Sequence, residues 1–124
     1  KLAAKLFLKN DELHDPMINR NHAISFGWAT EDQLDQMRAI SLKINDVLRN
    51  VFSEAGLILV DAKYEFGIQG NEVILGDEIS PDSCRLWDAL TKESLDKDRF
   101  RKNLGGVMDS YHEVAARLGV ALTA

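Results

Sequence analysis

Charged side chains alternate with apolar ones along a short stretch near the middle of the chain. Asp61, Lys63 and Glu65 stand two residues apart, and this spacing places side chains on one face of a β-strand. Another acid, Asp77, follows the next apolar run. If residues 69–71 form a loop between two antiparallel strands, Lys63 is paired with Asp77, and Glu65 is a diagonal neighbour of Asp77 at roughly 7 Å between β-carbons.

This arrangement predicts a site for a hard divalent cation. Glu65 and Asp77 can reach inward and share one Mg²⁺ at about 2.1 Å per oxygen, with phosphate oxygens as the remaining ligands. The alternative interpretation is that Asp61, Lys63 and Glu65 form the solvated face of a hairpin, because alternation is typical of strands with one face in water. Gly76 favours the metal site, since a glycine beside Asp77 lets a ligand approach the backbone.

The residues after this hairpin include groups suited to an anionic substrate. Ser80, Asp82 and Arg85 offer a hydroxyl, a carboxylate and a guanidinium, and Arg donates two parallel hydrogen bonds to phosphate or carboxylate. A surface ion pair between Arg85 and Asp82 is the structural alternative. Arg101 could reach into the same cleft and Lys9 could reach a nucleotide phosphate, although each is also explained as a solvated side chain.

Helix signals flank the hairpin on both sides. Thr30 and Gln33 match a capping box, which predicts that a long helix begins there, and Gly56 is suited to the position after its end. Asp96 can cap a second long helix that continues to Leu118. The two glycines inside it, residues 105–106, are unfavourable in a helix and predict a close backbone approach, either to the hairpin or to a neighbouring subunit.

The fold class expected from these elements is α+β. Residues 57–66 and 72–78 predict two strands of an antiparallel hairpin packed against the two long helices, and residues 79–95 are expected to form a polar loop. Residues 1–29 are rich in turn-forming residues and predict an irregular opening segment with a short strand. Residues 30–124 are expected to form one α+β domain.

Composition excludes several classes of protein. A hydrophobic content of 45% with 28% charged residues is typical of a globular chain rather than a disordered one. The net charge of −5 provides no cationic footprint for nucleic acid. No apolar run approaches the roughly 20 residues that span a membrane, so a cytoplasmic location is expected. Cys84 is the only cysteine, which excludes an internal disulfide and a cysteine-based zinc site.

Several segments together resemble one enzyme family, the bacterial form of SAICAR synthetase (phosphoribosylaminoimidazole-succinocarboxamide synthase). The similarity runs in order from about Phe7 to Val120. The segments that carry it are residues 7–11, 14–16, 59–67, 75–82, 85–88 and 95–101.

This resemblance implies a reaction and a set of ligands. Members of the family use ATP to join L-aspartate to carboxyaminoimidazole ribonucleotide, giving SAICAR, ADP and phosphate in de novo purine biosynthesis, and they use Mg²⁺. The resemblance further implies a homodimer and the carboxyl-terminal part of a SAICAR-synthetase-like fold, related to ATP-grasp enzymes and kinases. A small-molecule kinase and a non-catalytic module that binds divalent cations remain the alternatives.

The resemblance also implies a role for each candidate residue. Asp61 and Lys63 would be catalytic residues that line the substrate cleft, and Glu65 and Asp77 would hold magnesium on the nucleotide phosphates. Lys9 would face ATP. Ser80, Asp82, Arg85 and Arg101 would bind the ribonucleotide, with Arg85 at its phosphate.

The chain departs from the family at its beginning. Family members carry a preceding nucleotide-binding domain with a Gly-Lys-Ala-Lys type turn and an Arg-containing Gly-Ser motif, and neither motif is present here. Lys1 to Lys5 do not resemble the residues expected immediately before Phe7 in this family. The resemblance therefore implies an incomplete portion of the enzyme, and we expect the isolated 124 residues to have no ligase turnover.

Overall fold

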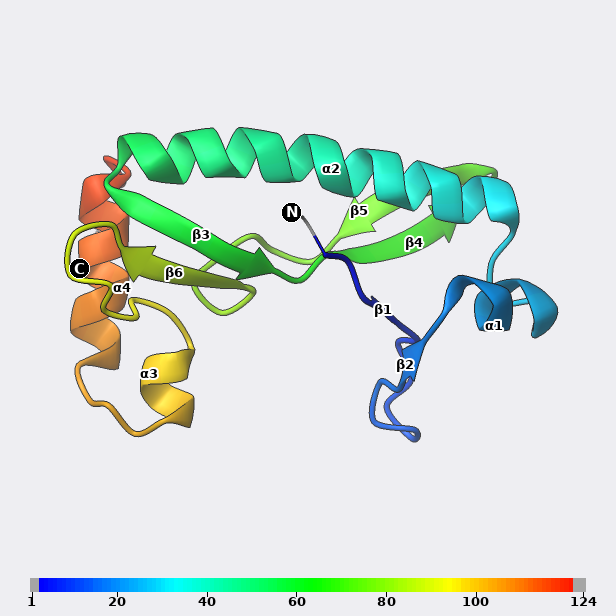
Figure 1. Cartoon of the computed structure of the whole chain (residues 1–124), viewed down its shortest axis with the longest axis horizontal. Coiled ribbons are helices and arrows are strands. Elements are labelled where there is room, and N and C mark those ends of the chain that lie inside the picture. The colour runs from blue at the N-terminus through cyan, green and yellow to red at the C-terminus, as the bar shows by residue number, and fades with distance from the viewer. Residues whose placement is uncertain (1–2, 122–124) are drawn as a thin grey trace. The chain divides into compact units, whose positions relative to one another are not determined.

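The computed structural model describes residues 3–121 and contains helices and antiparallel strands, which confirms the expected α+β class (Figure 1). Contacts divide the chain into two units, Lys1–Ala39 and Ile40–Ala124. The boundary expected between residues 29 and 30 stays a prediction. Within residues 3–121, no helix combines the length and the apolar character that a membrane crossing requires.

The first unit contains a short strand pair and a short helix. Strand β1 (Leu6–Phe7) pairs antiparallel with β2 (Met17–Ile18), which confirms the expected short strand. Helix α1 (Arg20–Ser25) follows directly, and the side chain of Asn19 caps it by accepting a hydrogen bond from the backbone N–H of His22 at 2.8 Å. This hydrogen bond satisfies one of the donors that a helix start leaves without a partner.

Helix α2 (Glu31–Glu54) begins and ends where the sequence predicts. The backbone N–H of Gln33 donates to the Thr30 hydroxyl at 3.1 Å, and the backbone N–H of Thr30 donates to the Gln33 side chain at 3.0 Å. This reciprocal pair confirms the capping box. Gly56 adopts a left-handed φ of 71° just after the helix, a conformation that glycine reaches without steric cost.

The long first strand expected over residues 57–66 is two strands with different partners. Strand β3 (Leu57–Ala62) pairs with β6 (Cys84–Asp88), while β4 (Glu65–Gln69) pairs with β5 (Glu72–Gly76). The expectation of an unbroken loop over residues 79–95 was therefore wrong. Strand β6 places alternate residues in the core, since Cys84 and Leu86 are fully buried.

The hairpin register also differs from the expected one. Strands β4 and β5 pair Glu65 with Gly76 and Gln69 with Glu72, so the turn contains two residues rather than three. Gly70 in this turn has a left-handed φ of 61°, as two-residue hairpin turns require. The predicted pairing of Lys63 with Asp77 was wrong, because Glu65 faces Gly76, the residue before Asp77. The predicted diagonal placement of Glu65 and Asp77 was wrong for the same reason, since diagonal neighbours lie two positions from the facing residue.

The second long helix is broken into two pieces. Helix α3 (Asp98–Arg101) and helix α4 (Val107–Arg117) are separated by a turn in which Gly105 and Gly106 have φ values of 73° and 61°. The glycines thus permit a left-handed turn. The predicted approach to the hairpin was wrong, since no described atom lies within 4 Å of a β-carbon built on Gly105, and the atom beside Gly106 is Nε of Arg99 at 4.0 Å. The approach to a neighbouring subunit stays a prediction.

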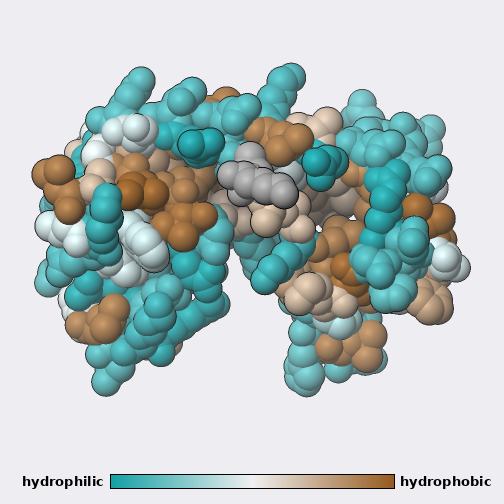
Figure 2. Space-filling model, viewed as in Figure 1, coloured by the Kyte–Doolittle hydropathy of each residue, from teal (hydrophilic) through white to brown (hydrophobic). Residues whose placement is uncertain are grey.

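The core of the second unit joins α2, the β3–β6 pair and α4. Its buried members are Phe52, Leu57, Cys84, Leu86, Leu95 and Val114. Burying a leucine side chain contributes roughly 1.5–3 kcal/mol, so these contacts fix the strands that carry the polar residues described below. Apolar side chains also reach the surface (Figure 2), and Leu90 and Phe100 are exposed by 93% and 78%.

Candidate functional site

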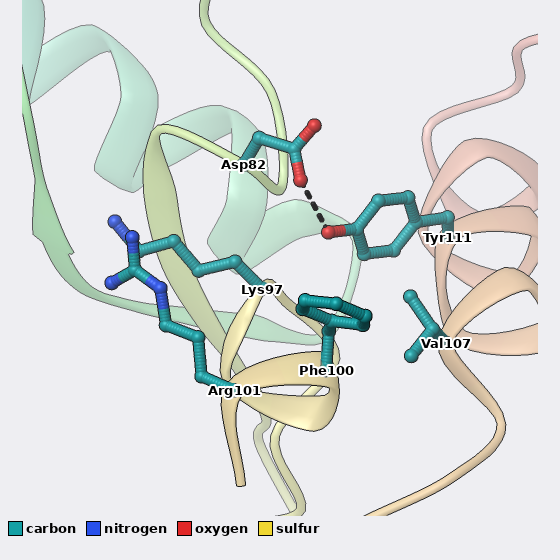
Figure 3. Close-up of a pocket in the computed structure, with 6 residues that line it drawn as sticks. All are labelled: Asp82, Lys97, Phe100, Arg101, Val107 and Tyr111. Atoms are coloured by element: carbon teal, nitrogen blue, oxygen red, sulfur yellow. Dashed lines mark hydrogen bonds between the residues drawn. The ribbon is translucent and has the colours of Figure 1, made fainter. Parts of the chain in front are cut away.

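A pocket of about 390 Å³ lies in the second unit, where the loop between β5 and β6 meets α3 and α4 (Figure 3). The loop contributes an acid, α3 and the residue before it contribute two basic side chains and an aromatic ring, and α4 contributes a valine and a tyrosine. The lining residues are Asp82, Lys97, Phe100, Arg101, Val107 and Tyr111. The pocket therefore combines one carboxylate with two cations.

The loop that carries Asp82 is held by its own polar groups. Buried Ser83 donates from its hydroxyl to the carbonyl of Glu78 at 3.0 Å and accepts a hydrogen bond from the N–H of Ser80 at 3.0 Å. The N–H of Asp82 donates to the Ser80 hydroxyl at 3.1 Å, and the N–H of Lys97 donates to the Pro81 carbonyl at 2.9 Å. The last bond ties the loop to the start of α3.

Tyr111 donates a short hydrogen bond from its hydroxyl to Oδ1 of Asp82. Burial and this bond to Asp82 both raise the pKa of Tyr111 above its ordinary value. The tyrosine therefore stays protonated and acts as a donor over the whole physiological pH range.

Arg85 lies between two carboxylates. Its Nη1 donates to Asp61, its strand partner on β3, and its Nε donates to Oδ2 of Asp98 at 3.0 Å. The alternative pairing of Arg85 with Asp82 was wrong. The hydrogen bond to Asp61 raises the pKa of Arg85, so the guanidinium is a permanent positive charge next to the pocket loop.

Lys63 and Glu65 form an ion pair, with 3.0 Å between Nζ and Oε1. Lys63 lies in the break between β3 and β4, and Glu65 is the first residue of β4. The structure thus brings these two predicted residues together. Asp77 directly follows β5 with a left-handed φ of 63°, and its Oδ1 accepts a hydrogen bond from the N–H of Glu78 at 2.9 Å.

The carboxylates of Glu65 and Asp77 are suited to Mg²⁺ by chemistry, because it prefers hard oxygen ligands. No group of three or more His, Cys, Asp or Glu side chains that could hold a metal occurs among residues 3–121. Magnesium at nucleotide sites commonly uses one or two carboxylates, and phosphate supplies further oxygens.

Two further residues predicted for the site are Lys9 and Arg101. Lys9 is exposed in the first unit, two residues after β1. Arg101, the last residue of α3, lines the pocket together with Asp82. Tyr111 and Asp98 were not predicted to be functional from the sequence. Tyr111 fits the apolar pattern of a helix face, and Asp98 was expected in an exposed first turn of a helix.

Comparisons with known proteins place the chain beside one group of enzymes. A family model described as SAICAR synthetase matches residues 2–118. The phosphoribosylaminoimidazole-succinocarboxamide synthase of Coxiella burnetii is 66% identical over 119 residues, which are 96% of this chain and 50% of that protein. The chain spans about half the length of the curated relatives it matches.

Solved structures of the same enzymes have the same fold. The phosphoribosylaminoimidazole-succinocarboxamide synthase of Ehrlichia chaffeensis gives a TM-score of 0.90 at 47% identity, over 96% of this chain and 52% of that one. A SAICAR synthetase (Type-2) in complex with ADP also gives a TM-score of 0.90 at 47% identity, over 97% of this chain and 52% of that one.

Proposed function

This chain belongs to the SAICAR synthetase family, whose model matches residues 2–118, and we propose that it is the carboxyl-terminal part of an ATP-dependent carbon–nitrogen ligase. The complete enzyme joins L-aspartate to carboxyaminoimidazole ribonucleotide and forms SAICAR, ADP and phosphate in de novo purine biosynthesis. The names of the relatives and the ADP bound to a solved neighbour support this reaction. The rest of the cleft is assigned to residues outside this sequence.

The placement of Arg85 is the structural observation that carries the proposal. Asp61 and Asp98 hold its Nη1 and Nε, whereas its Nη2 makes no hydrogen bond within the described part of the chain. A guanidinium has five N–H donors in a rigid fork, so donors remain for a phosphate or a carboxylate. Arg85 is therefore oriented for an anionic substrate such as the phosphate of the ribonucleotide.

The reaction consists of two transfers. The substrate carboxylate attacks the γ-phosphorus of ATP, the bond to the ADP oxygen breaks, and an acyl phosphate forms. The aspartate amine then attacks the acyl carbon, the carbon–oxygen bond to phosphate breaks, and the amine loses a proton. Lys63 supplies positive charge between the two anionic reactants, and Asp61 orients Arg85 through their hydrogen bond.

Glu65 and Asp77 would hold Mg²⁺ on the nucleotide phosphates. When bound, the ion neutralises phosphate charge and polarises the transferred group. The ion pair between Glu65 and Lys63 places the lysine next to this carboxylate, so one hairpin end supplies both the metal ligand and the proposed catalytic cation. Lys9 is assigned to ATP.

Ser80, Asp82 and Arg101 are assigned to the ribonucleotide together with Arg85. The pocket they share with Tyr111 offers cations for anionic groups and a carboxylate for hydroxyl or amine donors. A homodimer in the cytoplasm completes the proposal. Light scattering of the complete enzyme would test the dimer.

The function is tested in a complete enzyme, made by fusing the amino-terminal half of the Coxiella burnetii relative to this chain. We expect ATP cleavage that depends on both L-aspartate and the ribonucleotide, with SAICAR as the product. A kinase would release ADP without aspartate. A folded fusion that produces no SAICAR, beside an active Coxiella burnetii enzyme, would overturn the proposed function.

Asp77→Asn in this fusion tests the metal assignment. Losing one of two carboxylate ligands should lower kcat by roughly 100-fold or more, equal to at least about 2.7 kcal/mol of barrier. The matched control is Asp46→Asn, which makes the same change on the exposed side of α2. Equal activities of the two variants would refute the role of Asp77, and an unchanged melting temperature would separate loss of metal binding from loss of folding.

A further inference from the structure

Tyr111 closes one side of the pocket and touches Asp82, the one carboxylate among the described residues that line it. Figure 3 shows its ring on α4 directed toward the loop between β5 and β6, with the hydroxyl on Asp82. Lys97 and Arg101 extend from the start and the end of α3 on another side of the same pocket. The residue therefore contacts the acid and neither of the two cations by a hydrogen bond.

Helix α4 holds Tyr111 in a fixed place. Its neighbours Ser110 and Val114 are buried, with 7% and 3% of their surfaces exposed, so this face of α4 is anchored in the core. Arg99 fixes the turn before α4 by donating to the carbonyls of Ser94, Leu104 and Gly105. The tyrosine hydroxyl is thus a preorganised donor, because its ring is carried by a helix that packs against the core.

Asp82 is held much less firmly by its own segment. It is exposed on the loop, and its backbone N–H bonds to Ser80, but Tyr111 is the only described residue that hydrogen-bonds its side chain. Its second oxygen, Oδ2, accepts no hydrogen bond from the described residues. Tyr111 therefore selects one orientation of the carboxylate and leaves Oδ2 for a donor from a ligand.

The charges of the pocket explain why this orientation matters. Lys97 and Arg101 make no ion pair within the described residues, although Asp82 lines the same pocket. A carboxylate free to turn toward Lys97 or Arg101 would be attracted to them, since opposite charges attract at short range. Such a pair would neutralise the groups that bind the substrate and fill the space between them.

We infer that Tyr111 is a positioning residue for the ribonucleotide, because it holds Asp82 apart from Lys97 and Arg101. The pocket then presents separated charges and takes a ligand that carries both an anionic group and a hydroxyl or amine donor. This inference rests on the proposed function, which assigns Asp82 and Arg101 to the ribonucleotide. It adds a residue that acts through Asp82 and has no role in phosphoryl transfer itself.

The test is Tyr111→Phe in the fused enzyme, which removes one hydroxyl and keeps the ring. The KM for carboxyaminoimidazole ribonucleotide should rise about tenfold, as expected for losing a hydrogen bond to a charged group, while the KM for ATP and kcat stay within twofold. KM does not depend on the amount of folded enzyme, so partial unfolding cannot imitate this result. A rise in both KM values, or in neither, would overturn the inference.

Tyr64→Phe is the matched control, because the hydroxyl of Tyr64 is buried without a hydrogen-bond partner among the described residues. It should leave the ribonucleotide KM unchanged. Asp82→Ala provides the second comparison: adding Tyr111→Phe to it should change the KM no further, since Tyr111 acts only through Asp82. If the two substitutions raised the KM additively, Tyr111 would not act through Asp82, and the inference would be overturned. An inactive wild-type fusion would instead count against the proposed function.

Discussion

Arg85 donates a hydrogen bond from Nε to the buried carboxylate of Asp98 at 3.0 Å, and this bond joins β6 to the first turn of α3. Burial alone would raise the pKa of Asp98, but the charges and hydrogen bonds of Arg85 and Lys102 outweigh it and lower that pKa. The carboxylate is therefore ionised at neutral pH. It fixes an arginine that the proposed function places on the substrate phosphate.

Asp98→Asn should weaken both the fold and substrate binding. Removing the charge leaves Arg85 with Asp61 as its remaining ionic partner, which should cost roughly 1–3 kcal/mol of unfolding free energy and raise the KM for the ribonucleotide. Urea unfolding and steady-state kinetics of the fused enzyme measure the two effects. Asp109→Asn, an exposed acid in the first turn of α4, is the control. Equal unfolding midpoints for the two variants would contradict the prediction.

Asp88 should make the stability depend on acid pH. Hydrogen bonds from the Thr91 N–H, from Arg117 and from the Leu90 N–H lower the pKa of Asp88 far below its ordinary value of 3.8. A lowered pKa in the folded state stabilises the protein above the ordinary pKa, and this contribution is lost as pH falls below it. Asp88→Asn should therefore flatten the fall of the urea midpoint between about pH 5 and about pH 2. Parallel curves for wild type and variant would refute this.

Tyr64→Phe should stabilise the protein. The hydroxyl is buried without a partner among the described residues, and burial raises the pKa of Tyr64, with a smaller contribution from Cys84. Removing an unsatisfied buried polar group should add roughly 1 kcal/mol to the unfolding free energy. Tyr111→Phe is the natural comparison, since that hydroxyl is bonded and its loss should lower the free energy. A lower unfolding midpoint for Tyr64→Phe would contradict the prediction.

Local signals in the sequence were sufficient for the features that depend on neighbouring residues. The capping box of Thr30 and Gln33 and the stop at Gly56 were confirmed because each involves residues only a few positions apart. Pairing between strands far apart in the sequence was harder to predict. Strand β6 pairs with β3 across the whole hairpin, and its sequence follows a proline-containing polar loop that carries no strand signal of its own.

In the candidate site, too, local features were predictable from the sequence and long-range contacts were not. Asp61, Lys63 and Glu65 were expected on one side because of their spacing, and the Lys63–Glu65 ion pair shows two of them together. The partners of Arg85 were not predictable, since Asp61 and Asp98 approach it only after β3, β6 and α3 have packed. The hydrogen-bonded Tyr111 was hidden for the same reason, because its apolar ring fits the pattern of a helix face.

Substitutions of Gly106 test whether its left-handed conformation accounts for the break between α3 and α4. Its φ of 61° lies in the left-handed region, where an L-residue with a β-carbon is strained by roughly 1–2 kcal/mol. Gly106→Ala should lower the unfolding free energy by about that amount, and Gly106→Asn by less, because asparagine tolerates this conformation. Gly67→Ala in β4 is the matched control, since that glycine has no left-handed φ and no described atom within 4 Å of its added β-carbon. If both alanine variants unfold at the same urea concentration, the left-handed turn does not account for the break between α3 and α4.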